Sequence, residues 1–234
     1  MKQLKFLVFM PILCLIITTG CSTIGKSGKY YGVQTAGKNI VFVIDVSGSM
    51  EGKNEGNVTD KLRAQAAEKA GDKVGSMIGG PLGGLMSKGV KRESTKLASA
   101  KRELGPAIRG LDEATRFTIV LFSSSTKHWK KGLVKATSGN RTKASLYVER
   151  LKSSGGTAAL RGLKAAFAIK GADTIFFLSD GFPSDASSGK ILEEVKSMNS
   201  EGQITIHAIG LGDNKDENFL KKLAEENGGK YKEG

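Results

Sequence analysis

Three oxygen-bearing side chains follow an apolar run near residue 45. Asp45, Ser47 and Ser49 form the pattern D-x-S-x-S directly after residues 40–44. That run is mostly β-branched, which is typical of a central strand covered on both faces. Sheets of the α/β class bind ligands at the carboxyl ends of such strands. Because a carboxylate and two hydroxyls stand there with no His or Cys nearby, they favour a hard cation such as Mg²⁺ over zinc.

Two later segments carry the same kinds of side chain. Thr157 follows a pair of glycines at the predicted start of a helix, and Asp180 follows the apolar run at 174–179. In a doubly wound sheet, neighbouring strands that wind in opposite directions open a crevice at their carboxyl ends. We expect both residues to reach the same edge of the sheet as Asp45. The alternative is that these Ser, Thr and Asp side chains only cap helices and turns.

Together the five residues resemble the metal-ion-dependent adhesion site of the von Willebrand factor type A domain. That family's signature is D-x-S-x-S, a Thr in a later loop and an Asp after a later strand, and here it falls on Asp45, Ser47, Ser49, Thr157 and Asp180. The resemblance covers about residues 39–231 once an insertion at 52–90 is set aside. It implies direct metal coordination by the Ser and Thr hydroxyls, with the two aspartates acting largely through water. It also implies Mg²⁺, or Mn²⁺ or Ca²⁺ in its place, and a protein partner that completes the site with an Asp or Glu carboxylate.

Strand and helix patterns alternate along residues 39–234, which we interpret as one domain. This alternation predicts an α/β fold, doubly wound and Rossmann-like, whose mostly parallel sheet has helices on both faces and one antiparallel edge strand. The predicted strands are 39–44, 117–122, 174–179 and 204–209, with a short edge strand in 127–133, and the predicted helices are 143–151, 157–169, 189–200 and 216–227. The ending at 228–231 resembles the family's turn into its last strand.

The insertion at 52–90 carries a regular series of small residues. They recur every four positions, on one face of a helix, and resemble a glycine zipper: Ala67, Gly71, Gly75, Gly79, Gly83 and Ser87. Residues 74–87 lack charge, but fourteen residues are too few to span a bilayer as a helix. Two interpretations stay open. One is membrane contact or self-association through 67–87, and the other is a Gly-rich loop after a short helix at 59–70, interrupted by Pro81.

The N-terminus has the pattern of an export signal. A basic flank precedes twelve apolar residues at 6–17, then small residues and Cys21, which predicts a signal peptide at 1–20. Cys21 resembles the lipobox cysteine of bacterial lipoproteins, which implies cleavage before it and acylation. Residues 21–38 would then be a lipidated terminus and polar linker that holds the protein at the cell envelope, at the outer membrane if the cell is diderm. A plain secretory signal is the alternative.

The sequence gives little support for an enzyme. Residues 20–27 fit the phosphate-binding pattern G-x-x-x-x-G-K-[ST], but the mechanism requires a helix to begin at the Lys, and residues 28–32 have no helical period and two glycines. No candidate base stands near Ser47, and no G-x-S-x-G is present. With only His128 and His207 in the chain, no His-based zinc site is expected. A P-loop NTPase is therefore the weakest of the alternatives.

The formal net charge is +13, and the densest basic stretch is 127–150, with seven basic residues and one acidic residue. This stretch could face anionic lipid, glycan or nucleic acid, or be a solvated surface. Its only aromatic residues, Trp129 and Tyr147, are too few for a base-stacking platform, which disfavours nucleic acid.

These observations predict an exported, membrane-anchored binding domain that engages a protein partner through a divalent cation, in adhesion or envelope-complex assembly. The alternative is an envelope-associated structural protein that oligomerises through the insertion.

Overall fold

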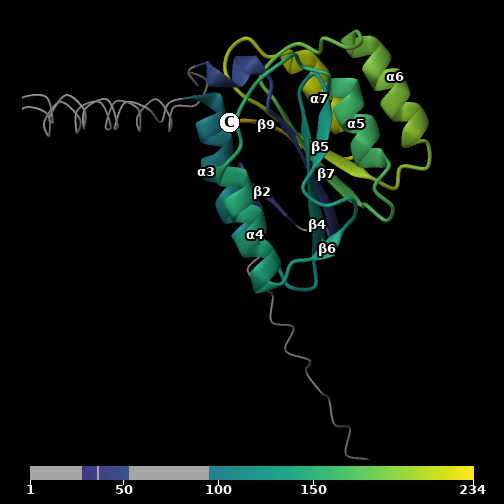
Figure 1. Cartoon of the computed structure of the whole chain (residues 1–234). Helices are drawn as coiled ribbons and strands as arrows, with labels where there is room; N and C mark the ends of the chain where they lie inside the picture. Colours follow the sequence, from purple (N-terminus) through teal and green to yellow (C-terminus); the bar gives the residue numbers. More distant parts are fainter. Residues whose placement is uncertain (1–27, 36, 53–94) are drawn as a thin grey trace, which may run out of the picture.

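The computed structural model describes residues 28–35, 37–52 and 95–234 (Figure 1). The predicted signal peptide, Cys21, the P-loop-like pattern and the small-residue series of the insertion lie outside these ranges. No helix within the described ranges is both long and apolar enough to cross a membrane.

Within the described residues, seven strands form one sheet in the order β5-β4-β3-β7-β8-β9, with β6 also paired to β4. Strands β3, β4, β7, β8 and β9 are parallel, and β5 and β6 run antiparallel to β4. The strands are β3 (Asn39–Asp45), β4 (Arg116–Phe122), β5 (Thr126–His128), β6 (Val134–Lys135), β7 (Thr174–Ser179), β8 (Thr205–Gly210) and β9 (Tyr231–Glu233). The predicted fold class, a mostly parallel α/β sheet with an antiparallel edge, is confirmed.

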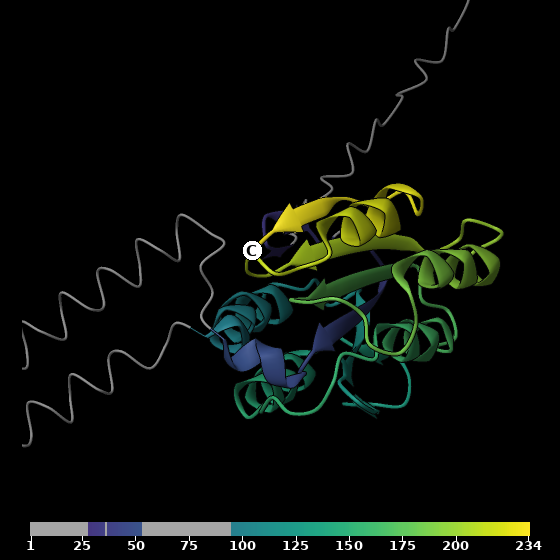
Figure 2. The same ribbon diagram turned by 90° about the horizontal axis from the view of Figure 1, so that it is seen from above.

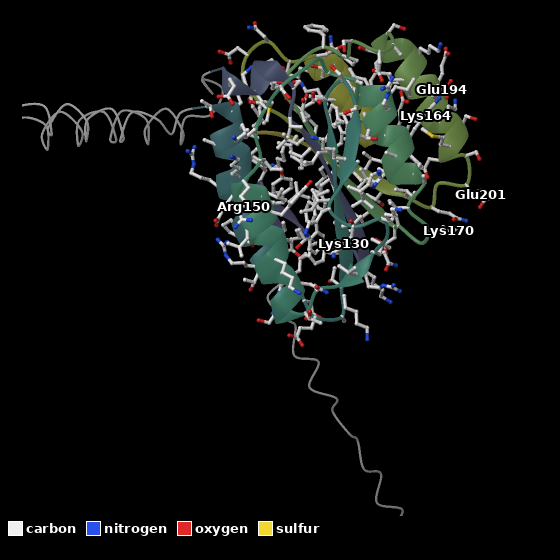
Figure 3. The ribbon with its side chains drawn as sticks, in the orientation of Figure 1. Lys130, Arg150, Lys164, Lys170, Glu194 and Glu201 are labelled. Atoms are coloured by element: carbon white, nitrogen blue, oxygen red, sulfur yellow. The ribbon has the colours of Figure 1, made fainter. Side chains whose placement is uncertain are left out.

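Helices cover both faces of the sheet (Figures 1 and 2). Side chains alternate along β3, so Phe42 packs in the core beneath α3 and α4, whereas Val41 and Val43 pack beneath α5, α6 and α7. Both faces of β3 are fully buried, as its continuous apolar run predicts. The helices are α3 (Lys96–Arg109), α4 (Ser138–Glu149), α5 (Ala159–Phe167), α6 (Ser188–Met198) and α7 (Glu217–Glu225). On the outer surface Lys164 of α5 and Glu194 of α6 form an ion pair of 2.8 Å (Figure 3).

Helix α3 is absent from the sequence prediction. The adjacent Gly105 and Pro106 are typical of a helix end, because proline removes one helical hydrogen bond. The helix nevertheless continues to Arg109, since its buried face, which includes Leu97, Leu104 and Ile108, packs against the core. Thr95 caps its first turn by accepting a hydrogen bond from the Ala98 N–H at 3.1 Å.

A β-hairpin occupies part of the predicted linker. Strands β1 (Lys29–Tyr30) and β2 (Val33–Gln34) are joined by Tyr31 and Gly32, both with positive φ, as a two-residue hairpin turn requires. Tyr30 is fully buried, with its ring edge-on to Phe42 at 5.6 Å between centroids. The hairpin therefore belongs to the packed domain, which its polar composition does not reveal.

The register of the sheet places three strand ends side by side. Asp45 at the end of β3 is level with Phe122 at the end of β4. On the other side of β3, Ile44 pairs with Leu178, so Ser179 is the next position along β7. The chain runs outward from β3 to β4 and then returns to β7 on the opposite side of β3. This reversal of strand order is the place where doubly wound sheets form a ligand crevice.

Candidate metal centre

Asp45 is held rigidly at the end of β3. Its side chain is buried, and each carboxylate oxygen accepts one hydrogen bond, Oδ1 from the Ser47 N–H at 2.8 Å and Oδ2 from the Ser179 hydroxyl at 2.7 Å. Burial raises the pKa of Asp45 to about 6, and the two serine neighbours act in the opposite direction by stabilising the carboxylate. The nearby Asp180 carboxylate adds a smaller upward shift of the pKa.

Asp180 follows β7 and lies across the crevice from the first motif. The Ser49 hydroxyl donates to its Oδ1 at 2.8 Å, and the Ser47 and Ser49 hydroxyl oxygens are 3.0 Å apart. The Lys96 ammonium donates to its Oδ2 at 2.7 Å. Four of the five predicted residues, Asp45, Ser47, Ser49 and Asp180, are therefore joined in one hydrogen-bonded chain.

Thr157 reaches the same place through its backbone. The Gly48 N–H donates to the Gly155 carbonyl at 2.9 Å, which joins the loop before Thr157 to the turn after β3. Gly155 has a φ of +81°, a conformation that favours glycine. Thr157 is buried, and its N–H donates to the Ser184 hydroxyl at 3.0 Å. Among the described residues no group hydrogen-bonds its hydroxyl, which leaves that oxygen for a ligand.

The donor set fits a hard cation. The candidate ligand atoms are hydroxyl and carboxylate oxygens, with no imidazole or thiolate among them, which suits Mg²⁺, Mn²⁺ or Ca²⁺. The side-chain nitrogen shown in the cluster is the Lys96 ammonium, which is a cation and cannot be a ligand. The described residues contain no group of three His, Cys, Asp or Glu side chains that could hold a metal. A metal at this place would therefore depend on the hydroxyls of Ser47, Ser49 and Thr157. We refer to Asp45, Ser47, Ser49, Thr157 and Asp180 as the candidate metal centre.

Three supporting residues escaped the sequence prediction. Lys96 pairs with Asp180, Ser179 orients Asp45, and Ser184 holds the Thr157 backbone. Ser179 adjoins Asp180 in the sequence, so its place at the strand end was a usable signal. The other two contacts depend on how α3 and the loop after β7 fold, and no local pattern marks them.

Asp185 has a structural role. Its two oxygens accept the N–H groups of Leu160 and Arg161, at 3.2 and 2.9 Å, in the first turn of α5. The residue before that helix, Ala158, provides no side-chain cap, so Asp185 supplies one from a distant loop.

His207 is a sheet residue, as predicted. Its Nδ1 accepts the Lys230 N–H at 3.0 Å, and its ring lies 4.8 Å from that of Phe176. Burial lowers its pKa, and the Lys230 charge adds to the effect.

Fold and cluster together define a Rossmann-like α/β domain with hydroxyl and carboxylate ligands at the reversal of strand order. The chain belongs to the von Willebrand factor type A domain family, whose profile matches residues 38–65 and 89–233. The unmatched residues 66–88 fall inside the predicted insertion. Domains of this family typically bind protein ligands and are generally not catalytic.

Sequence relatives contain the domain within much longer proteins. Human von Willebrand factor A domain-containing protein 3A is 32% identical over 117 residues, 49% of this chain and 10% of that protein. Mouse inter alpha-trypsin inhibitor heavy chain 4 is 25% identical over 208 residues, 83% of this chain and 18% of that protein. The chain thus spans less than a fifth of the length of these relatives.

Solved structures share the fold. A von Willebrand factor type A protein from Catenulispora acidiphila superposes with a TM-score of 0.60 at 22% identity, covering 84% of this chain and 38% of that one. An aerotolerance-related membrane protein from Bacteroides fragilis superposes with a TM-score of 0.56 at 16% identity, covering 85% and 92%. Proximal thread matrix protein 1 from the mussel byssus, solved with zinc in its MIDAS motif, has a TM-score of 0.52 at 17% identity, covering 83% and 41%.

Proposed function

We propose that this domain binds a protein partner through a divalent cation held at the candidate metal centre. The cation is Mg²⁺, with Mn²⁺ or Ca²⁺ as substitutes, and the partner contributes an Asp or Glu carboxylate. The observation that carries this proposal is the hydrogen-bonded chain from Asp45 through Ser47 and Ser49 to Asp180, at the reversal of strand order.

The hydroxyls and the carboxylates would contact the cation in different ways. Both Asp45 oxygens already accept hydrogen bonds from protein groups, and both Asp180 oxygens do so from Ser49 and Lys96. These aspartates are therefore placed to act through water, whereas the Ser47, Ser49 and Thr157 hydroxyls would hold the cation directly. With little anionic charge in direct contact, the cation would remain electrophilic and attract a partner's carboxylate.

The same surroundings favour binding over catalysis. Among the described residues, the side chain bonded to the Ser47 hydroxyl is another serine, Ser49, which cannot serve as a base. His207 is engaged with the backbone of Lys230, and His128 is exposed on edge strand β5. The two histidines, the residue type that most often acts as a general base, therefore do not serve the Ser47 hydroxyl.

Calorimetric titration with Mg²⁺ tests the metal assignment. The wild-type protein is expected to bind one cation, and Asp45→Asn is expected to lose that binding while keeping its circular dichroism spectrum. Asp213→Asn is the matched control, since Asp213 is an exposed carboxylate in the loop after β8. If Asp45→Asn bound Mg²⁺ like wild type, the site assignment would be wrong.

We also propose that Cys21 anchors the domain to the cell envelope through acyl chains. The lipobox-like sequence supports this, and so does the fold shared with a Bacteroides fragilis membrane protein. Two acyl chains are enough for stable anchoring. Mass spectrometry of the mature protein should find an acylated Cys21 at its N-terminus, and an unmodified cysteine would exclude the anchor.

A second candidate function is self-association through the insertion. The Lys96 N–H donates to the Gly52 carbonyl at 2.9 Å, so the described residues that flank positions 53–94 lie side by side. A short link can therefore join these two flanking positions. Replacing residues 53–94 with a short Gly-Ser link should abolish oligomers while Mg²⁺ binding survives, if the insertion drives assembly. Unchanged oligomers in ultracentrifugation would exclude this role.

A further inference from the structure

A pocket of about 330 Å³ opens beside the candidate metal centre. Three basic side chains line it, Lys127, Arg150 and Lys152, together with Ser123, Ser125 and Ser154. We call it the basic pocket. Its wall includes Val46, which stands between Asp45 and Ser47 in the chain.

The basic pocket is joined to the metal loops by backbone contacts. The Ser154 N–H donates to the Val46 carbonyl at 2.8 Å, and the Ala158 N–H donates to the Ser123 carbonyl at 2.9 Å. Thr157 adjoins Ala158 in the chain. The pocket and the candidate metal centre thus share loops, and a ligand held by one lies next to the other.

The Glu51 carboxylate accepts a hydrogen bond from the Ser153 hydroxyl, next to pocket residues Lys152 and Ser154, but positive charge predominates in the basic pocket. No carboxylate lines it, and its three basic residues have no described ion pair. Arg150 lies at the C-terminal end of α4, where positive charge is favourable in any case (Figure 3). Lys127, however, comes from β5 and Lys152 from the loop after α4, so cations from separate elements converge on one cavity.

An exposed aromatic side chain flanks the candidate metal centre on the other side. Phe182 is 66% exposed and stands two residues after Asp180. Because β4 and β7 lie on opposite sides of β3, the pocket and Phe182 fall on opposite sides of the candidate metal centre. Aromatic and Arg side chains dominate the binding energy of protein interfaces.

We infer that the basic pocket is a second subsite for the protein partner, and that the partner presents a segment with two acidic side chains. One carboxylate would complete the metal centre, the other would enter the basic pocket, and an apolar neighbour would cover Phe182. This inference rests on the proposed function. A protein segment fits better than a lipid surface or a polyanion, because the cavity is small and concave and an exposed phenyl ring flanks the candidate metal centre on its other side.

Peptide display provides the test. Random peptides are selected on the wild-type domain in Mg²⁺ and on the variant Lys127→Gln/Arg150→Gln/Lys152→Gln. Peptides selected on the wild-type domain should be enriched in two acidic residues. Peptides selected on the variant should be enriched in only one. A two-carboxylate peptide should bind the variant about ten-fold more weakly, and higher salt should reduce that difference.

The matched control is Lys130→Gln/Lys131→Gln/Lys135→Gln, which removes three charges from the same basic stretch outside the pocket. This variant should bind the two-carboxylate peptide as wild type does. Equal losses in both variants, or none in the pocket variant, would overturn the inference, as would heparin or inorganic phosphate occupying the pocket in place of peptides. Measuring Mg²⁺ affinity distinguishes failure of this inference from failure of the proposed function. The pocket variant should bind Mg²⁺ as wild type does. A wild-type protein that does not bind Mg²⁺ would instead contradict the candidate metal centre.

Discussion

The Lys96–Asp180 ion pair gives a prediction whose magnitude follows from the structure. The two side chains are 10% and 0% exposed, and 2.7 Å separates Nζ from Oδ2. Lys96→Met keeps the length of the side chain and removes its charge, which leaves a buried carboxylate without its cation. Breaking a buried pair in this way costs about 3–5 kcal/mol. Because the Lys96 ammonium keeps slight contact with solvent, we expect Lys96→Met to lower the free energy of unfolding by about 3 kcal/mol in the presence of a chelator.

That loss is large enough to measure by thermal unfolding. At about 2–4 °C per kcal/mol for a domain of this size, the Tm should fall by roughly 6–12 °C in EDTA. In Lys96→Met, Mg²⁺ should restore stability, because the bound cation supplies positive charge near the Asp180 carboxylate, which has lost the Lys96 ammonium. A ligand that binds the folded state raises stability with its affinity. The Mg²⁺-induced rise in Tm should therefore be larger in Lys96→Met than in wild type.

Lys215→Met is the matched control. Lys215 is equally buried and pairs with Glu233 at 2.7 Å, but it does not contact the candidate metal centre. This variant should lose stability in EDTA without changing its response to Mg²⁺. A Lys96→Met protein with wild-type Tm in EDTA, or with a smaller response to Mg²⁺, would refute the reasoning.

Three further predictions concern single positions. Thr157→Val should weaken Mg²⁺ binding at least ten-fold by calorimetry with little change of Tm in EDTA, and equal affinity would exclude a direct role for the hydroxyl. Gly162→Ala should lower stability by about 1–3 kcal/mol in urea unfolding, because an added Cβ would lie 2.8 Å from the Phe122 ring, whereas Gly189→Ala, in open space, should be neutral or stabilising. Burial lowers the His207 pKa, so the unfolded state binds its proton more readily and this residue costs stability as pH drops through about 6.5, whereas the raised pKa of Asp45 acts in the opposite direction; the Tm of His207→Gln should therefore rise relative to that of wild type as pH drops through about 6.5, and a constant difference would exclude the effect.

The main strands were predictable because they are long, apolar and bounded by turn residues. Helix α3 was not, because Gly105 and Pro106 resemble a terminus, and only the tertiary packing of Leu97 and Leu104 outweighs that local signal. The hairpin around Tyr30 was not predictable either, because a strand of two residues is too short to show a period-two pattern.

The five residues of the candidate metal centre were predictable because each stands directly after a strand or a glycine turn. Two of the three supporting residues, Lys96 and Ser184, were not predictable. Lys96 and Asp180 are 84 positions apart, and their contact exists only once α3 is placed against the sheet. Asp185 likewise caps a helix that begins 26 positions before it. Residue type predicts the chemistry, but the partners that orient it come from long-range packing.

The hydrogen bond between the Lys96 N–H and the Gly52 carbonyl makes the segment between them a suitable place to insert other sequences. Gly52 and Lys96 already lie in contact. Lengthening the segment between them should therefore add little to the entropic cost of closing that loop, which grows only slowly with loop length. A fluorescent reporter or an affinity tag placed there would leave the sheet intact. It would also be close in the chain to Lys96, whose ammonium pairs with Asp180 beside the candidate metal centre.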